Sequence, residues 1–192
     1  MNNTSSSVPL AQFPKLETPA TSVLEQAIDA HPFLAGLTAS QLGALKDNAL
    51  RIRYEPGAVI FREGSPANRF FLIQRGKVVL ESSRREGGPV FIQQLGPGDA
   101  LGWSWLIPPY YWHFDARVVE PTEAILFYGT RLREQCEADT DLGYELLKRM
   151  TSVVIQRLQG TRRQLLAAMA TARVQASWAC RFSMLPQTCG QP

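Results

Sequence analysis

The sequence predicts a mainly β domain, a double-stranded β-helix (jelly roll), with short N-terminal helices and a long C-terminal helix. Residues 50–128 contain short runs of β-branched and aromatic residues that glycines interrupt at close intervals, as in antiparallel strands joined by tight turns. Residues 22–46 and 140–172 instead place apolar residues at helical spacing. Because the strands follow one another without helices between them, we predict a β roll rather than a parallel sheet with helical crossovers.

The 192 residues, 45% of them hydrophobic, suit one domain with appendages. Residues 1–21 are rich in Asn, Ser, Thr and Pro and lack the basic start and apolar centre of a secretion signal, so we predict a disordered leader. We place the roll with its N-terminal helices at residues 22–137, a dimerisation helix at 138–175 and a tail at 176–192.

The charges are unevenly distributed along the chain. Residues 1–140 hold 13 Lys and Arg against 15 Asp and Glu, whereas residues 141–192 hold 7 against 2. The basic part would suit an acidic partner or nucleic acid, and a solvated helix face is the alternative. Three cysteines without metal-binding spacing favour a reduced, cytoplasmic protein, and no apolar run approaches the roughly 20 residues of a membrane helix.

Two short helices are predicted before the roll. Residues 22–30 have apolar side chains on one side, and His31-Pro32 ends this helix. A second helix begins after Thr38, whose hydroxyl is placed to cap it while Gln41 reaches back to the cap residue.

Seven strands are predicted in the roll, with a charged, glycine-rich hairpin tip at residues 84–88 and a turn at Pro121. The predicted strands are residues 50–54, 58–61, 70–74, 77–81, 90–94, 115–119 and 124–128.

The long C-terminal helix carries two apolar stripes. One has the alternating four- and three-residue spacing of a two-stranded coiled coil, which predicts a homodimer; helix packing on its own domain alone is the alternative. Its members are Leu147, Thr151, Val154, Leu158, Thr161, Leu165, Ala168 and Ala172. A second stripe, Leu146, Met150 and Val153, is placed to lie on the roll. Gly160 lowers helix propensity, so we expect a bend or an end there.

A glycine pattern within the roll carries a family resemblance. Its three parts are Gly57-x-x-Ile60-x-x-x-Gly64, Phe71-x-Ile73-x-x-Gly76-x-Val78 and Leu95-x-x-Gly98-Asp99-x-x-Gly102. Over residues 32–160 the chain thereby resembles the cyclic-nucleotide-binding domain of catabolite-activator and Fnr (Crp/Fnr) regulators. The resemblance implies a jelly-roll sensor that dimerises through its long helix and binds cyclic AMP or cyclic GMP.

The resemblance also implies a phosphate-binding cassette, a short helix that starts at Gly102 and whose free amides accept the cyclic phosphate. The glutamate that the family places after this glycine is Trp103 here. The family's phosphate-binding arginine falls at His113 or Phe114, and the next residue is Asp115.

The candidate ligand site follows from this comparison and from a cluster of aromatic residues between 103 and 114. Its predicted residues are Gly102, Trp103, Ser104, Trp105, His113, Asp115 and Arg117. Gly102, Ser104 and the helix amides would hold the phosphate, and a tryptophan would stack on the base. We expect Arg117 to pair with Asp115 rather than to anchor the phosphate. The alternatives are that the aromatic rings plug the roll, or that another, less charged ligand binds.

No catalytic arrangement is recognisable, and no cofactor is predicted. A metal-dependent cupin enzyme needs several imidazoles and a carboxylate on neighbouring strands, whereas the chain has only His31 and His113. About twenty residues follow Ala172, too few for a helix-turn-helix, so we expect no self-contained DNA-binding domain. We therefore predict a non-enzymatic sensor that signals through its C-terminal helix. The alternatives are a ligand-free protein-interaction module and a truncated Crp/Fnr-type transcription regulator.

Overall fold

The computed structural model describes residues 15–16, 21–82 and 88–182, with side chains from residue 22 to residue 170 of these ranges. The chain forms two compact units, Met1–Val154 and Ile155–Pro192. The predicted hairpin tip and most of the predicted leader lie outside the described residues. The predicted division at residue 138 remains a prediction.

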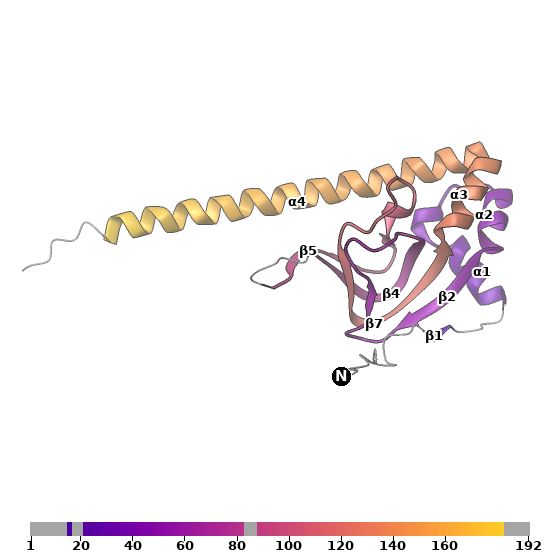
Figure 1. The fold of residues 1–192 in the computed structure, drawn as a ribbon, viewed down its shortest axis with the longest axis horizontal. Helices are drawn as coiled ribbons and strands as arrows, with labels where there is room; N and C mark the ends of the chain where they lie inside the picture. Colours follow the sequence, from indigo (N-terminus) through magenta and orange to yellow (C-terminus); the bar gives the residue numbers. More distant parts are fainter. Residues whose placement is uncertain (1–14, 17–20, 83–87, 183–192) are drawn as a thin grey trace, which may run out of the picture. The chain divides into compact units, whose positions relative to one another are not determined.

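The first unit is an antiparallel β roll, which confirms the predicted fold class (Figure 1). Its sheet has seven strands, with the order β1-β2-β7-β4-β5; β3 also pairs with β7, and β6 with β4. The strands are β1 Lys15–Leu16, β2 Ala49–Tyr54, β3 Val59–Phe61, β4 Arg69–Ser82, β5 Val90–Leu95, β6 Ala100–Leu101 and β7 Asp115–Tyr128. The leader was predicted to be disordered, but β1 pairs with the edge of β2.

Strands β4 and β7 are each longer than predicted. We predicted separate strands at residues 70–74 and 77–81, but these residues form the single strand β4. The strands predicted at residues 115–119 and 124–128 likewise form the single strand β7, which pairs with β4. The register shifts between Arg75 and Val78, so the strands bend without leaving the ladder. Gly76, with φ of 85°, lies against Pro121 and Thr122 so closely that a Cβ atom would overlap the Pro121 carbonyl oxygen.

The alternating side chains of β4 enter two separate cores. Phe71, Ile73, Val78 and Leu80 lie in the core inside the roll. Phe70 and Leu72 lie in a second core, under the helices. The roll therefore has an inner face that could meet a ligand and an outer face that meets the helices.

The N-terminal helices α1 (Thr21–Asp29), η2 (Pro32–Leu34) and α2 (Ala39–Lys46) cover the outer face of the sheet. The capping box that the sequence predicts is present: the Gln41 amide donates to the Thr38 hydroxyl at 3.3 Å, and the Thr38 amide donates to the Gln41 side chain at 3.0 Å.

Helix α3 (Gly129–Ala138) follows β7 directly, and α4 (Thr140–Phe182) comes next. The stripe of Leu146, Met150 and Val153 packs in the second core, as predicted. Among the described seam residues, Leu147, Leu158 and Leu165 are 45%, 68% and 60% exposed. Helix α4 continues through Gly160, and it is the last element in the described part of the chain.

No helix in the described ranges is both long and apolar enough to span a membrane.

His31 joins the helical cover to the roll and should make stability depend on pH. Its ring is buried; Nδ1 accepts the Phe33 amide at 3.2 Å, and Nε2 lies 3.3 Å from the Ile73 carbonyl oxygen. Burial lowers the pKa of His31, although the Ile73 carbonyl and nearby Asp99 act in the opposite direction. The stabilising effect of the neutral ring is thus fully present above the unfolded-state pKa of about 6.5, and it is lost as pH falls through the folded-state pKa.

We expect His31→Asn to remove this contribution to the pH dependence, because asparagine keeps a capping oxygen but does not titrate. Urea unfolding of both proteins between pH 7.5 and about 5 measures it. Parallel stability curves for the two proteins would contradict the expectation.

Candidate functional site

The candidate cassette follows directly after β6, which pairs with β4 at Phe71 and Leu72. Gly102 adopts φ of 95° and starts the short 3-10 helix η3 (Trp103–Trp105). A Cβ atom on Gly102 would lie 2.9 Å from the Trp112 ring and 3.2 Å from the Arg69 carbonyl oxygen. Only glycine fits here, because both the backbone conformation and the space exclude a side chain.

Three of the predicted site residues form one polar and aromatic cluster. The Ser104 hydroxyl lies 3.0 Å from His113 Nδ1, and the His113 ring stacks on Trp103 with 4.8 Å between ring centroids and an interplanar angle of 19°. Ser104 is buried, Trp103 is half-buried and His113 is exposed. With Gly102, they form a flat aromatic surface next to a buried hydroxyl.

Trp105 lies in the second core, against which Trp103 also packs. Its side chain is fully buried in the second core together with Leu132, Leu142 and Leu146. Its Cβ atom lies 3.0 Å from the position of a Cβ atom built on Gly129, the first residue of α3. Trp105 therefore connects the cassette to the core that contains residues of α3 and α4.

Arg133 of α3 makes a second connection to the cassette. Its guanidinium donates to the Trp105 carbonyl oxygen at 2.6 Å and lies 4.5 Å from the centroid of the Tyr110 ring. The arginine thus joins α3 to both η3 and the loop that follows it. No motif of the sequence indicated this residue, because its partners become neighbours only through the fold.

The interior of the roll is filled by aromatic side chains. Trp112 stacks on Phe61 with 3.8 Å between centroids and an interplanar angle of 11°, and Phe114 packs against the same core. Tyr54 lies in this apolar core, and burial raises its pKa to about 12. Phe114, one of two positions considered for the family's arginine, therefore contributes packing and no positive charge.

The predicted ion pair between Asp115 and Arg117 is wrong. Arg117 Nε donates to Glu81 at 3.0 Å, and Asp115 Oδ1 accepts the Glu63 amide at 2.6 Å. The prediction rested on two opposite charges two residues apart on one strand. In the fold, Glu81 of β4 lies directly opposite Asp115 and is within reach of Arg117, so Arg117 pairs across strands. Sequence spacing could not place Glu63 or Glu81 here, because they come from distant segments.

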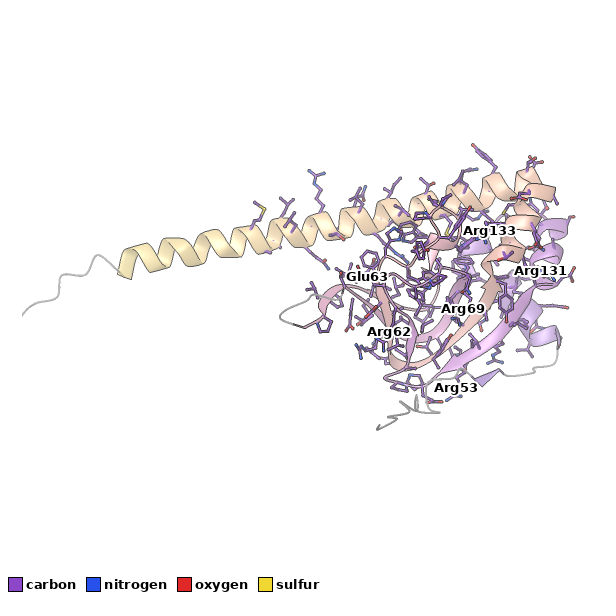
Figure 2. The ribbon with its side chains drawn as sticks, in the orientation of Figure 1. Arg53, Arg62, Glu63, Arg69, Arg131 and Arg133 are labelled. Atoms are coloured by element: carbon purple, nitrogen blue, oxygen red, sulfur yellow. The ribbon has the colours of Figure 1, made fainter. Side chains whose placement is uncertain are left out.

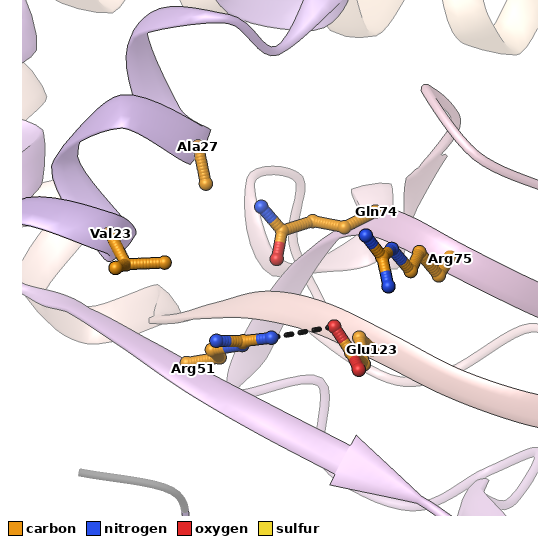
Figure 3. Close-up of a pocket in the computed structure, with 6 residues that line it drawn as sticks. All are labelled: Val23, Ala27, Arg51, Gln74, Arg75 and Glu123. Carbon is orange, nitrogen blue, oxygen red and sulfur yellow. Dashed lines mark hydrogen bonds and ion pairs between the residues drawn. The ribbon is translucent and has the colours of Figure 1, made fainter. Parts of the chain in front are cut away.

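Hollows lie on the outer side of the sheet beside α1. One, of about 300 Å³, is lined by Val23, Ala27, Arg51, Gln74, Arg75 and Glu123 (Figure 3). Arg51 and Glu123 form an ion pair across it at 2.7 Å. A neighbouring hollow of about 350 Å³ shares Ala27 and Gln74. Neither hollow includes a predicted site residue.

Metal binding by the described residues has no structural support, since no three of their His, Cys, Asp and Glu side chains are grouped to hold an ion.

Comparison with known proteins identifies the family. The family model of the cyclic nucleotide-binding domain matches residues 51–139. A Geobacter metallireducens GS-15 protein described as cyclic nucleotide-binding is 30% identical, with a TM-score of 0.64, over 70% of this chain and 97% of that chain. The chain belongs to the cyclic nucleotide-binding domain family. The prediction from the glycine pattern is confirmed.

Two further comparisons concern a solved sensor domain, which shares the fold, and a curated enzyme, which matches in sequence over part of its length. The sensor domain of the transcriptional regulator DNR from Pseudomonas aeruginosa is 21% identical, with a TM-score of 0.60, over 72% of this chain and 93% of that chain. Acetyltransferase Pat from Mycolicibacterium smegmatis is 32% identical over 82 residues, which are 43% of this chain. The match spans only 24% of that enzyme's length.

Gly102→Ala should destabilise the domain by about 2–5 kcal/mol, because a left-handed residue gains a Cβ atom and the Trp112 ring must move. Gly57→Ala is the matched control: its φ is 86°, but nothing lies within 4 Å of the added Cβ atom, so about 1–2 kcal/mol is expected. Urea unfolding measures both losses, and equal losses would contradict the close approach of Trp112.

Proposed function

We propose that this chain is a non-enzymatic sensor domain that binds a small ligand, cyclic AMP or cyclic GMP, at its cassette and passes the ligand state to its C-terminal helix. The observation that carries the proposal is the position of Trp105. This residue belongs to the cassette helix, yet its side chain packs among residues of α3 and α4. A ligand that shifts η3 must also shift the packing of these helices.

Arg133 supports the same route. A displacement of η3 changes its hydrogen bond to the Trp105 carbonyl oxygen and its contact with the Tyr110 ring, and both contacts act on α3. Arg149 of α4 in turn donates to the Ala35 carbonyl oxygen at 2.8 Å, which ties α4 to the N-terminal cover. The proposed signal thus has a continuous chain of contacts within the first unit.

For the ligand we propose an altered binding pose at the predicted site. Gly102, Ser104 and the backbone amides around them would take the phosphate, and the Trp103–His113 stack would take the base. Asp115 and Arg117 would line the side of the ligand opposite the cassette. Their contacts with the Glu63 amide and with Glu81 would hold them in place.

A second candidate function is a ligand-free protein-interaction module in the cytoplasm. The Trp112–Phe61 stack favours it, because these rings already fill the roll that a nucleotide would enter. The same titration tests both candidates.

Titration with cyclic AMP and cyclic GMP should produce a saturable change in tryptophan fluorescence, since Trp103 and Trp105 belong to the cassette helix and the Trp112 ring lies against Gly102. Ser104→Ala should weaken binding at least tenfold through loss of a buried hydroxyl, whereas Ser152→Ala, an exposed serine of α4, should not. A flat response to both nucleotides from folded protein at millimolar concentration would favour the ligand-free module.

The same samples test the transmission route. In the unaltered protein, ligand should change hydrogen-exchange protection of residues 142–150. In Arg133→Ala, affinity should persist while this change diminishes. An unchanged exchange response in Arg133→Ala would remove Arg133 from the route.

We also propose that the exposed seam of α4 pairs two copies of the chain. Leu158→Asp should dissociate a dimer at micromolar concentration, because a carboxylate would enter the apolar seam. Leu166→Asp is the matched control, since Leu166 is 55% exposed but lies off the seam. Sedimentation measures both, and a monomer for the unaltered protein would contradict the pairing.

A further inference from the structure

Three segments of the chain meet at the end of the roll, beside the cassette. The Ala67 amide donates to the Tyr110 carbonyl oxygen at 2.6 Å, and the Gly129 amide donates to the Asn68 carbonyl oxygen at 2.8 Å. Arg69 lies directly opposite Tyr128 in the β4–β7 ladder. The loop after η3, the start of β4 and the start of α3 are therefore fixed against one another.

This surface combines arginines with exposed apolar and aromatic side chains. We call it the roll-end patch and define it by Arg69, Ile107, Tyr111, Tyr128, Arg131 and Arg133 (Figure 2 labels its three arginines). Ile107, Tyr111 and Tyr128 are 48%, 49% and 48% exposed. Large apolar side chains at this exposure, carried by neighbouring segments, are a feature of interaction sites.

The arginines of the patch carry an excess of positive charge. Arg69 Nε meets the Asn68 side-chain oxygen at 3.4 Å, and Arg133 donates to Trp105 and Thr130 oxygens. Neither arginine has a carboxylate within 4.0 Å among the residues that the structure describes. Arg131 meets Glu134 at 3.6 Å, in a pair that is exposed to solvent on both sides. Such a pair contributes little to stability and exchanges easily for a better acidic partner.

The geometry points to a docking site for an acidic segment of another protein at the roll-end patch. Tyrosine and arginine are enriched at the centres of protein interfaces, where they supply contact area and charge-assisted hydrogen bonds. Nucleic-acid interfaces are more polar and much more positive. Ile107 and the exposed Pro108 and Pro109 beside it would meet no complement on a phosphate backbone.

Arg133 gives the docking site a physical connection to the cassette. Arg133, a member of the patch, donates to the Trp105 carbonyl oxygen and lies over the Tyr110 ring. A carboxylate bound there competes for the same donor. The inference does not require a cassette ligand, so it stands apart from the proposed sensing function.

Binding of a fluorescein-labelled peptide of alternating glutamate and leucine to the full chain, measured by anisotropy, tests the inference. We expect saturable binding at physiological salt. The double variant Arg69→Glu/Arg131→Glu should lose at least tenfold in affinity, about 1.4 kcal/mol, because two attractions become repulsions. Tyr111→Ala should weaken binding about fivefold through loss of aromatic contact, whereas Tyr144→Ala, at an exposed tyrosine of α4, should not.

The matched control for charge is Arg53→Glu/Arg75→Glu. Arg53 meets Glu55 at 3.4 Å in an exposed ion pair, which matches the pair of Arg131 with Glu134. The side chain of Arg75 is exposed. Both lie opposite Glu123, five residues from Tyr128 along β7. The site is refuted if this control loses as much affinity as the patch variant, or if folded protein does not bind the peptide at millimolar concentration. Tighter, patch-dependent binding of a labelled single-stranded oligonucleotide would overturn the protein assignment in favour of nucleic acid.

Discussion

The pairing of β4 with β7 is the constraint on which the rest of the domain depends. Both strands are 14 residues long, run antiparallel and bend at the same place, where Gly76 lies against Pro121 and Thr122. The bend closes one face around the inner core and leaves the other for the helices. The cassette follows β6, which pairs with one end of β4, and α3 starts where β7 ends. The candidate cassette and the helices are therefore held by the same two strands.

This arrangement explains why the cassette has two distinct faces. Ser104 and His113, with the Trp103 ring stacked on His113, form the proposed ligand side; Trp105 is fully buried in the second core, and half-buried Trp103 also packs against that core. Because η3 has only three residues, its two faces cannot move independently. Arg117 pairs with Glu81 across strands, so at the candidate site this guanidinium is already engaged with a carboxylate.

Local sequence patterns predicted the fold well and the site only in part. Glycine spacing located the roll, Thr38 and Gln41 located a helix start, and the stripe of Leu146 and Met150 located a packed helix face, since each signal lies within a few residues. The strands' continuity through Pro121, the Glu81 partner of Arg117 and the role of Arg133 escaped prediction. These features depend on contacts between segments tens of residues apart, which no single pattern encodes.

The stack of Trp112 on Phe61 has a consequence for how strongly any interior ligand can bind. In the closed roll the indole ring already occupies contact area that a ligand would otherwise cover. A ligand that needs this space binds only the minor population in which the ring has moved out. If that opening costs about 3 kcal/mol, the apparent affinity falls by roughly a hundredfold relative to a roll with the same contacts and no ring. Under the proposed sensing function, Trp112 would raise the ligand concentration needed for binding at the interior of the roll.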